Sequence, residues 1–310
     1  MDRIIVPLDG SELSERALGL GVALAEAYGG QLELVHVVDE PLAYTLMPGL
    51  AIPDPLSAER YLQRVAGNLR EGLPVTTNVI HGEPVTALLD LTRDAPNTMI
   101  VMSTQGRGGL GRLMLGSVTD KVLRGATVPV AVVRGSAPVP QRGLRTILVP
   151  LDDSRFSESA LPLAADLARQ LDATLSLVQV CEPFWSAPSA ASIPDAMYVT
   201  DMNLSELERE NLTGARRYLD LVATERRAQG VRVIWEVRTG KAADEILRAT
   251  ETTDADLIVM ATHGRSGIRR WAFGSVTNEL LHRGTTPILA IPVGLVERQE
   301  QHVNGLLSTM

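Results

Sequence analysis

Two stretches of the chain, VPLDGSELSERAL at residues 6–18 and VPLDDSRFSESAL at residues 149–161, are near copies of each other. A second pair follows later in each half, STQGRGGLGRLMLGSVT at residues 103–119 and ATHGRSGIRRWAFGSVT at residues 261–277. A repeat this long is a whole domain, because the units of solenoid proteins span only about 20–50 residues. The sequence therefore predicts two tandem domains of the same fold.

The spacing between the two copies changes along the chain. Pro150 follows Pro7 by 143 residues, whereas Gly264 follows Gly106 by 158 residues. The second copy therefore holds 15 additional residues, which lie within about Glu182 to Asn211. We predict three parts of the chain: a first domain at residues 1–136, a second domain at residues 143–294 and a polar C-terminal tail at residues 295–310.

The composition restricts the class of protein. Hydrophobic residues make up 45% of the chain and charged residues 21%, which suits two packed cores with a soluble surface. The apolar stretches are too short to span a bilayer, and the N-terminus lacks a signal-peptide pattern. A net charge of −8 disfavours nonspecific binding to nucleic acid. The single cysteine, Cys181, excludes an intramolecular disulfide and is interpreted as a core residue at a strand end. We expect a cytoplasmic protein that binds neither nucleic acid nor membrane.

Short β-branched runs alternate with helical stretches in each half. The first half contains five such runs, RIIVPLD, QLELVHVVD, VTTNVI, TMIVMS and VPVAVV, and the second half contains five counterparts. The segments between them carry apolar residues at helical spacing. Alternation of this kind predicts parallel strands, right-handed crossovers and helices on both faces. The expected fold class is α/β, with two tandem doubly wound domains, each a five-stranded parallel sheet flanked by helices.

The chemistry-bearing segments follow the strands, where ligands bind in open α/β sheets. Gly106 and Gly264 permit a positive-φ turn and let backbone N–H groups approach a ligand closely. Nine residues intervene before Gly116-Ser117 and Gly274-Ser275, which open the last helix of each half. Unpaired N–H groups and the helix dipole attract an anion there, which predicts a phosphate site. The alternative is that the two serines are only N-caps and the glycines only form loops.

These segments resemble the universal stress protein family, whose ATP-binding members carry Gly-x2-Gly-x9-Gly-(Ser/Thr) after the fourth strand. The resemblance covers residues 3–134 and 145–293, and it implies an adenine-nucleotide α-hydrolase-like fold. The later motif positions are all present, as Gly106, Gly116 and Ser117, and as Gly264, Gly274 and Ser275. The first glycine is replaced by Ser103 in one half and by Ala261 in the other.

The resemblance also implies roles for residues at the strand ends. An aspartate after strand one holds the ribose or reaches toward the phosphates, which points to Asp9 and Asp152. The residues that would border the adenine are Pro7, Val37, Pro150 and Val180. A competing interpretation is that Asp9 and Asp152 cap the following helices, a task that Ser11 or Ser154 could share.

In function, the resemblance implies a nucleotide-dependent module of the stress response and of signalling, with ATP in each domain and Mg²⁺ on its phosphates. It also implies that strand five of one domain pairs with strand five of another, which gives an internal pseudo-dimer and a homodimer. No residue supplies a general base, a nucleophile pair or a metal-ligand cluster, so we predict no catalytic or metal-binding residue and at most slow ATP hydrolysis. The alternative is a nucleotide-free interaction scaffold of the same fold, which Ser103 and Ala261 favour. The protein partners are unknown.

Overall fold

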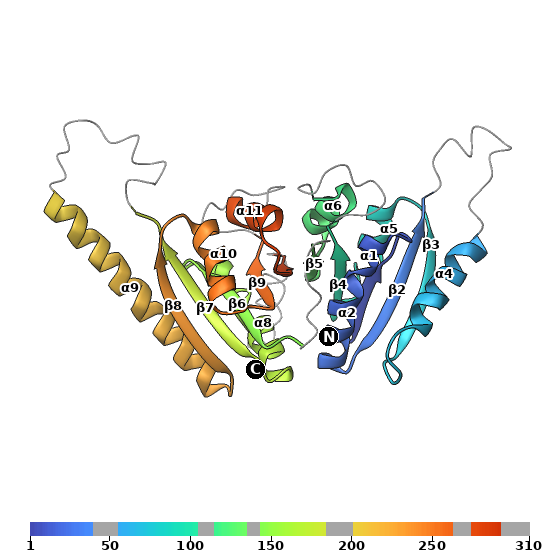
Figure 1. The fold of residues 1–310 in the computed structure, drawn as a ribbon, viewed down its shortest axis with the longest axis horizontal. Helices are drawn as coiled ribbons and strands as arrows, with labels where there is room; N and C mark the ends of the chain where they lie inside the picture. Colours follow the sequence, from blue (N-terminus) through green and yellow to red (C-terminus); the bar gives the residue numbers. More distant parts are fainter. Residues whose placement is uncertain (40–54, 105–114, 135–142, 184–200, 263–273, 293–310) are drawn as a thin grey trace, which may run out of the picture. The chain divides into compact units, whose positions relative to one another are not determined.

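The computed structural model describes residues 1–39, 55–104, 115–134, 143–183, 201–262 and 274–292. Contacts between residues divide the chain into two compact units. The first unit holds the described residues up to Gly143 together with those from Thr285 onward, and the second holds those from Leu144 to Gly284. Each unit is a twisted sheet with helices packed against it (Figure 1).

The first unit follows the predicted alternation of strands and helices. Its elements are β1 (Arg3–Pro7), α1 (Glu12–Glu15), α2 (Ala17–Tyr28), β2 (Gln31–Val38), α4 (Pro55–Gly67), β3 (Val75–His81), α5 (Pro84–Asp90), β4 (Thr98–Ser103), α6 (Ser117–Gly125) and β5 (Val130–Val133). The strands lie in the order β3-β2-β1-β4-β5, and all four pairs are parallel.

The second unit repeats this arrangement. Its elements are β6 (Thr146–Leu151), α7 (Arg155–Glu158), α8 (Leu161–Gln170), β7 (Thr174–Cys181), α9 (Asp201–Ala228), β8 (Arg232–Thr239), α10 (Ala242–Thr252), β9 (Leu257–Ala261) and α11 (Ser275–Arg283). The parallel order β9-β6-β7-β8 matches β4-β1-β2-β3. The predicted α/β class with two tandem domains is therefore confirmed.

The last strand, β10 (Ile288–Ile291), is grouped by its contacts with the first unit. It pairs antiparallel with β5, and Leu289 lies opposite Ala131. The segments VPVAVV and TPILAIP, which the resemblance pairs, are therefore adjacent strands.

Helices cover both faces of the first sheet, which explains why its strands are apolar at nearly every position. Gly21 of α2 lies against Val6 and Leu32, which share one face. A Cβ at Gly21 would come within 2.7 Å of Val6 Cγ2, so glycine permits the close approach of helix to sheet. On the opposite face, the guanidinium of Arg3 donates to the carbonyl of Leu91, just after α5.

Two helix boundaries differ from the expectation. The stretch SELSERALGLGVALAEAYGG, whose apolar spacing predicts one helix after strand one, is divided into α1 and α2, and the C-cap of α2 is Gly29 with a left-handed φ of 58°. In the second half, α9 begins at Asp201, 12 residues before Thr213, which is the counterpart of the first residue of α4, so 12 of the 15 additional residues extend this helix at its N-terminus. The insertion therefore lengthens a helix.

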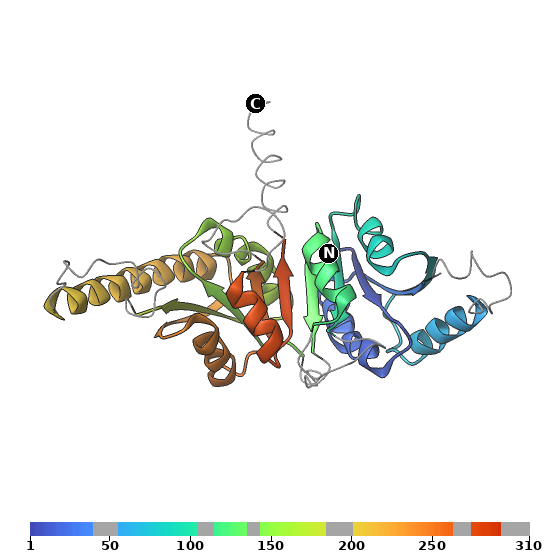
Figure 2. The ribbon, with the colours of Figure 1, turned by 90° about the horizontal axis from the view of Figure 1, so that it is seen from above.

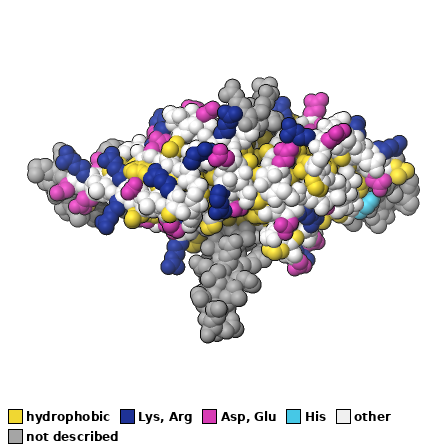
Figure 3. Space-filling model, turned by 90° about the horizontal axis from the view of Figure 1, so that it is seen from below, with side chains coloured by type: hydrophobic (Ala, Val, Ile, Leu, Met, Phe, Trp, Pro, Cys, Tyr) yellow, Lys and Arg dark blue, Asp and Glu magenta, His cyan; other side chains and the backbone are white. Residues whose placement is uncertain are grey.

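The surface drawn in Figure 3 carries charges of both signs. Lys and Arg side chains are interspersed with Asp and Glu side chains, and hydrophobic side chains form small patches between them. In the described part of the chain, no helix is both long enough and apolar enough to cross a membrane.

Candidate functional site

The residues predicted to border an adenine lie at the carboxyl ends of neighbouring strands. Pro7 is the register partner of Val35, and Val37 lies two residues further along β2, so the side chains of Pro7 and Val37 are on one face of the sheet. Pro150 and Val180 are related in the same way in the second half. All four predicted residues are half-buried. The structure therefore brings each predicted pair together at the predicted edge.

Asp9 directs the start of the helix that follows strand one. Its Oδ1 accepts hydrogen bonds from the backbone N–H of Ser11 at 3.0 Å and from the Ser11 hydroxyl at 2.6 Å. Ser11 is the N-cap of α1, and its Oγ accepts a hydrogen bond from the N–H of Ser14 at 3.1 Å. The aspartate therefore orients the capping hydroxyl.

The second half repeats this arrangement. Asp152 Oδ1 accepts hydrogen bonds from the backbone N–H of Ser154 at 3.1 Å and from its hydroxyl. Ser154 is the N-cap of α7 and accepts from the N–H of Ser157 at 3.2 Å. The serines are therefore the N-caps, and the aspartates support the capping indirectly by accepting hydrogen bonds from the serine hydroxyls. Their contact with a nucleotide stays a prediction.

The residue after each aspartate turns the chain from strand to helix with a left-handed backbone. Gly10 has a φ of 83°, and its counterpart Asp153 has a φ of 61°. Glycine adopts this conformation without strain, whereas an aspartate there carries a cost of about 1 kcal/mol. The same turn is therefore built from different residues in the two halves.

A repeated tyrosine–glutamate hydrogen bond lies beside this turn. The hydroxyl of Tyr61 in α4 donates to Glu15 Oε1 at 3.0 Å, and that of Tyr218 in α9 donates to Glu158 Oε1 at 3.0 Å. Burial and then the bond to Glu15 raise the pKa of Tyr61 to about 12. Burial and the charge of Glu158 raise the pKa of Tyr218. Both phenols are therefore neutral hydrogen-bond donors. They hold α4 against α1 in the first half and α9 against α7 in the second half. The sequence analysis missed these pairs, although both members recur in both halves.

Hydrogen bonds join the end of strand four to the start of the last helix in each half. In the first half, the N–H of Gly116 donates to the carbonyl of Thr104 at 2.5 Å, and the hydroxyl of Thr119 donates to the carbonyl of Ser103 at 2.8 Å. In the second half, the N–H of Gly274 donates to the carbonyl of Thr262 at 3.0 Å. The N-terminus of the last helix is thereby fixed at the carboxyl end of the sheet in each half.

The alternative that Ser117 and Ser275 are N-caps is wrong. These serines are the first residues of α6 and α11, and the N-caps are Gly116 and Gly274. A serine inside the helix cannot take the extended backbone that a capping hydroxyl requires. Because glycine has no side chain, neither N-cap offers an oxygen to the first-turn N–H groups. These donors and the positive end of the helix dipole can attract an anion.

The backbone of Gly116 is extended, with φ −62° and ψ 144°. Any residue adopts this conformation, so backbone strain does not explain the glycine.

Ser103 occupies the first position of the glycine motif. The residue is 7% exposed, and its Oγ is buried with no hydrogen-bond partner in the structure described. Ala261 at the matching position is also buried. Small side chains thus stand at this position in both halves.

Two predicted residues, Gly106 and Gly264, lie outside the described residues. Within the described ranges, no three His, Cys, Asp or Glu side chains come together as a metal site. Cys181 is buried at the end of β7, and burial raises the pKa of its thiol, in agreement with a core role.

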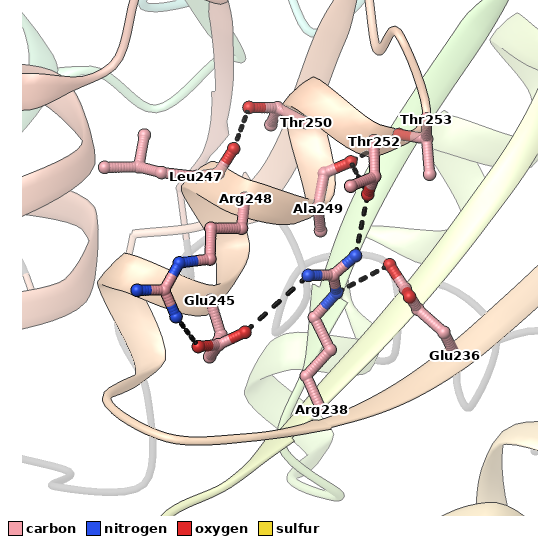
Figure 4. Close-up of polar contacts among 9 residues, drawn as sticks. All are labelled: Glu236, Arg238, Glu245, Leu247, Arg248, Ala249, Thr250, Thr252 and Thr253. Carbon is pink, nitrogen blue, oxygen red and sulfur yellow. Dashed lines mark hydrogen bonds and ion pairs between the residues drawn. The ribbon is translucent and has the colours of Figure 1, made fainter.

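A polar cluster that the sequence analysis did not single out lies beside β8 and α10 (Figure 4). Arg238 forms ion pairs with Glu236 at 2.8 Å and with Glu245 at 3.6 Å, and it donates to Thr252 Oγ1 at 2.7 Å. The buried Glu245 also bonds Arg248. The nearby carboxylate of Glu236 is the main cause of a raised pKa at Arg238. The cluster fastens α10 to β8.

The described residues of the first half do not form this cluster, and a different buried ion pair is found there. Ile80 stands at the position of Arg238. Instead, the buried Glu33 of β2 pairs with Arg3 and accepts a hydrogen bond from Asn78 Nδ2 at 3.0 Å. The two units therefore share their turns and helix ends but differ in their buried ion pairs.

Comparison with known proteins identifies the family. The model of the universal stress protein family matches residues 1–134 and 143–292. A universal stress protein of Mycobacterium tuberculosis is 28% identical over 300 residues, which cover 92% of this chain and 95% of that protein. One of Mycolicibacterium smegmatis is 26% identical over 300 residues, with coverage of 93% and 96%.

A solved structure shares the fold. The universal stress protein of Archaeoglobus fulgidus superposes with a TM-score of 0.64 at 18% identity, over 94% of this chain and 98% of that one. Since the family matches span both halves of the sequence, the chain belongs to the universal stress protein family.

Proposed function

We propose that each half of the chain binds ATP and that the protein acts as a nucleotide-dependent module of the stress response rather than as a fast enzyme. The observation that carries the proposal is the N-terminus of the last helix. In both halves a glycine N-cap leaves the first-turn N–H groups without a side-chain acceptor at the carboxyl edge of the sheet. An edge of this kind is where open α/β sheets bind their ligands.

The surrounding residues suit a nucleotide. The phosphates would lie at Gly116-Ser117 and at Gly274-Ser275, where the N–H groups and the serine hydroxyl can donate. The half-buried Pro7 and Val37 offer apolar contact to an adenine. Asp9 follows β1 and Asp152 follows β6, and we propose that each contacts the ribose. The proposed site residues outside the described part are Gly106 and Gly264.

Mg²⁺ suits this site as an ion carried by the phosphates. It is bound by phosphate oxygens with one or two carboxylates and several waters. Asp9 and Asp152 are carboxylates at this edge, and each already holds a serine through Oδ1. The ion would therefore depend on the nucleotide for most of its ligands. We expect this activity in the cytoplasm, in an internal pseudo-dimer that also forms a homodimer.

The test is calorimetric titration of the full chain with ATP and Mg²⁺, after denaturing a sample and identifying any released nucleotide by mass spectrometry. The matched variant is Gly116→Asp/Gly274→Asp, which puts a carboxylate at each N-cap. We expect two sites in the wild type and their loss in the variant. A well-folded wild-type protein that binds no ATP at millimolar concentration would exclude the proposal.

The second candidate is a nucleotide-free interaction scaffold. The replacement of the first motif glycine by Ser103 and Ala261, both buried, favours it, because each side chain takes up space that glycine leaves open. The same titration separates the two functions, since a scaffold gives no heat with ATP.

A further inference from the structure

Helix α9 extends beyond the sheet of its own unit. Residues 205–214 contain no buried position, and the first buried residue of the helix with described side chains is Ala215. From there the helix packs on β7 and β8 through Ala215, Leu219, Val222 and Ala223. Figures 1 and 2 show the first turns of α9 reaching out past β8. Glu208 and Leu212 are half-buried in this segment, with Glu208 Oε1 buried, and its other positions are exposed. A helical segment with so little packing is marginal in water, so this extension favours a partner.

The outward side of α9 carries an apolar stripe. Leu207 is 52% exposed and Leu221 is 63% exposed, and Gly214 lies midway between them. The three residues are seven apart, which places them on one side of a helix. A Cβ at Gly214 would meet no atom within 4 Å, so this point of the stripe is open. Two exposed leucines at heptad spacing are a pattern typical of a helix–helix contact.

Charged residues of opposite sign flank the stripe on one side. Glu210 lies four residues before Gly214 and Arg217 lies three residues after it, and both are exposed. At 100° per residue they sit about 40° and about 60° from Gly214 in the same direction around the helix. In the described part of the chain, neither side chain takes part in an ion pair, and the two do not pair with each other because seven residues span about 10 Å of helix.

We propose that α9 pairs antiparallel with α9 of a second copy of this chain, crossing at Gly214. A two-fold axis through this crossing sets Leu207 against the partner's Leu221, because both lie seven residues from Gly214. It also sets Glu210 beside the partner's Arg217, and the same contacts recur on the other side of the axis. Gly214 lets the two backbones approach. A parallel pairing would bring the leucines together but not the opposite charges, so the charges select the antiparallel arrangement.

This contact is distinct from strand pairing through β5 and from the nucleotide site. Two of its contact residues, Leu207 and Glu210, precede the part of α9 that corresponds to α4, so the shorter helix of the first half has no turns to match them. In this proposal, the insertion of the second half forms part of a dimerisation arm.

The first test is sedimentation equilibrium of the full chain over a concentration series. We expect a reversible dimer in the wild type and a monomer in Leu207→Asp/Leu221→Asp, with unchanged circular dichroism, since both side chains are exposed. Arg217→Glu should raise the dimer dissociation constant at least about tenfold by placing like charges together. The double variant Glu210→Arg/Arg217→Glu exchanges the two charges, so it should restore the dissociation constant of the wild type. A monomeric wild type, or a dimer that survives Leu207→Asp/Leu221→Asp, would overturn the proposal.

Cysteine cross-linking tests the register. Gly214→Cys should form a disulfide-linked dimer, because the crossing brings the two residues together. Leu221→Cys alone should not, since the two copies of residue 221 lie about 21 Å apart along the helices. A mixture of Leu207→Cys and Leu221→Cys chains should cross-link as a heterodimer. The wild type, whose sole cysteine Cys181 is buried, is the control. Cross-linking of Leu221→Cys with itself would contradict the antiparallel register.

Discussion

The helix that follows strand one and the helix that follows strand four begin at the same edge of each sheet, but their N-termini are completed differently. At α1, Ser11 accepts the N–H of Ser14 and is itself held by Asp9. At α6, Gly116 offers no side-chain acceptor. The second half repeats both arrangements, at α7 and at α11.

The difference shows which N-terminus serves the fold and which is open to a ligand. A capped terminus has satisfied its donors and stabilises the helix by about 1 kcal/mol. A glycine N-cap lowers the stability of the helix by a few tenths of a kcal/mol relative to serine. It leaves the first-turn N–H groups and the positive end of the helix dipole open to an anion. Since two separate copies keep the same contrast, we attribute it to the proposed phosphate site. Two predictions test this contrast, and two more test the turn and the tyrosine–glutamate hydrogen bond beside the capped helix.

The largest expected effect comes from giving α6 and α11 the kind of cap that they lack. In Gly116→Asp/Gly274→Asp, the added carboxylates satisfy the first-turn N–H groups and repel phosphate. We expect ATP affinity to fall at least about tenfold, which is about 1.4 kcal/mol, with no loss of thermal stability. Calorimetric titration and a melting curve measure the two. An unchanged affinity would mean that the phosphates bind elsewhere.

Two serine substitutions should separate stability from binding. Ser11→Ala removes a cap and should lower the free energy of unfolding by about 1 kcal/mol. Ser117→Ala, inside α6, should leave stability nearly unchanged and weaken ATP binding. Urea unfolding and ATP titration of both variants give the comparison. Equal losses of stability in the two variants would contradict the assignment of caps.

The turn before the capped helix gives a smaller effect. Gly10→Ala forces a side chain into a left-handed backbone and should cost about 1 kcal/mol. Asp153→Gly removes an existing strain but adds freedom to the unfolded chain, so it should change stability by less than about 0.5 kcal/mol. Urea unfolding of both variants measures the two changes. If Gly10→Ala were tolerated as well as Asp153→Gly, the two turns would not differ in strain.

The smallest effect at neutral pH concerns Tyr61. Its pKa rises from 10.0 to about 12 on folding, so the folded state holds the phenol proton more tightly than the unfolded chain. The corresponding stability is complete below pH 10 and is lost as the pH rises through about 12. Tyr61→Phe should modestly lower the free energy of unfolding at pH 7. Because phenylalanine has no proton to lose, this free energy should also decline less steeply above pH 10 in the variant than in the wild type. Chemical unfolding of both proteins from pH 7 to pH 12 measures this, and parallel curves would contradict it.

The sequence predicted the strands and most helices of both units because the spacing of hydrophobic residues is regular in each of them. β4 and β9 are apolar runs buried at every position, and the helices between strands keep an amphipathic spacing. The sequence also predicted that Pro7, Asp9 and Gly116 lie at the carboxyl edge of the sheet, and the structure places them there, while their contact with a nucleotide stays a prediction. The N-caps of α6 and α11 were less certain, because a Gly-Ser pair allows either residue to begin the helix.

The pattern of residues along the chain determined by itself that the protein is a tandem repeat of an α/β domain, because local spacing and turn residues are encoded locally. Only the tertiary structure decided how distant polar groups pair. Tyr61 with Glu15, Glu33 with Arg3, and Arg238 with Glu245 join residues from different elements. Such pairs form only when packing brings the elements together and removes water, and no local spacing in the sequence records that distance.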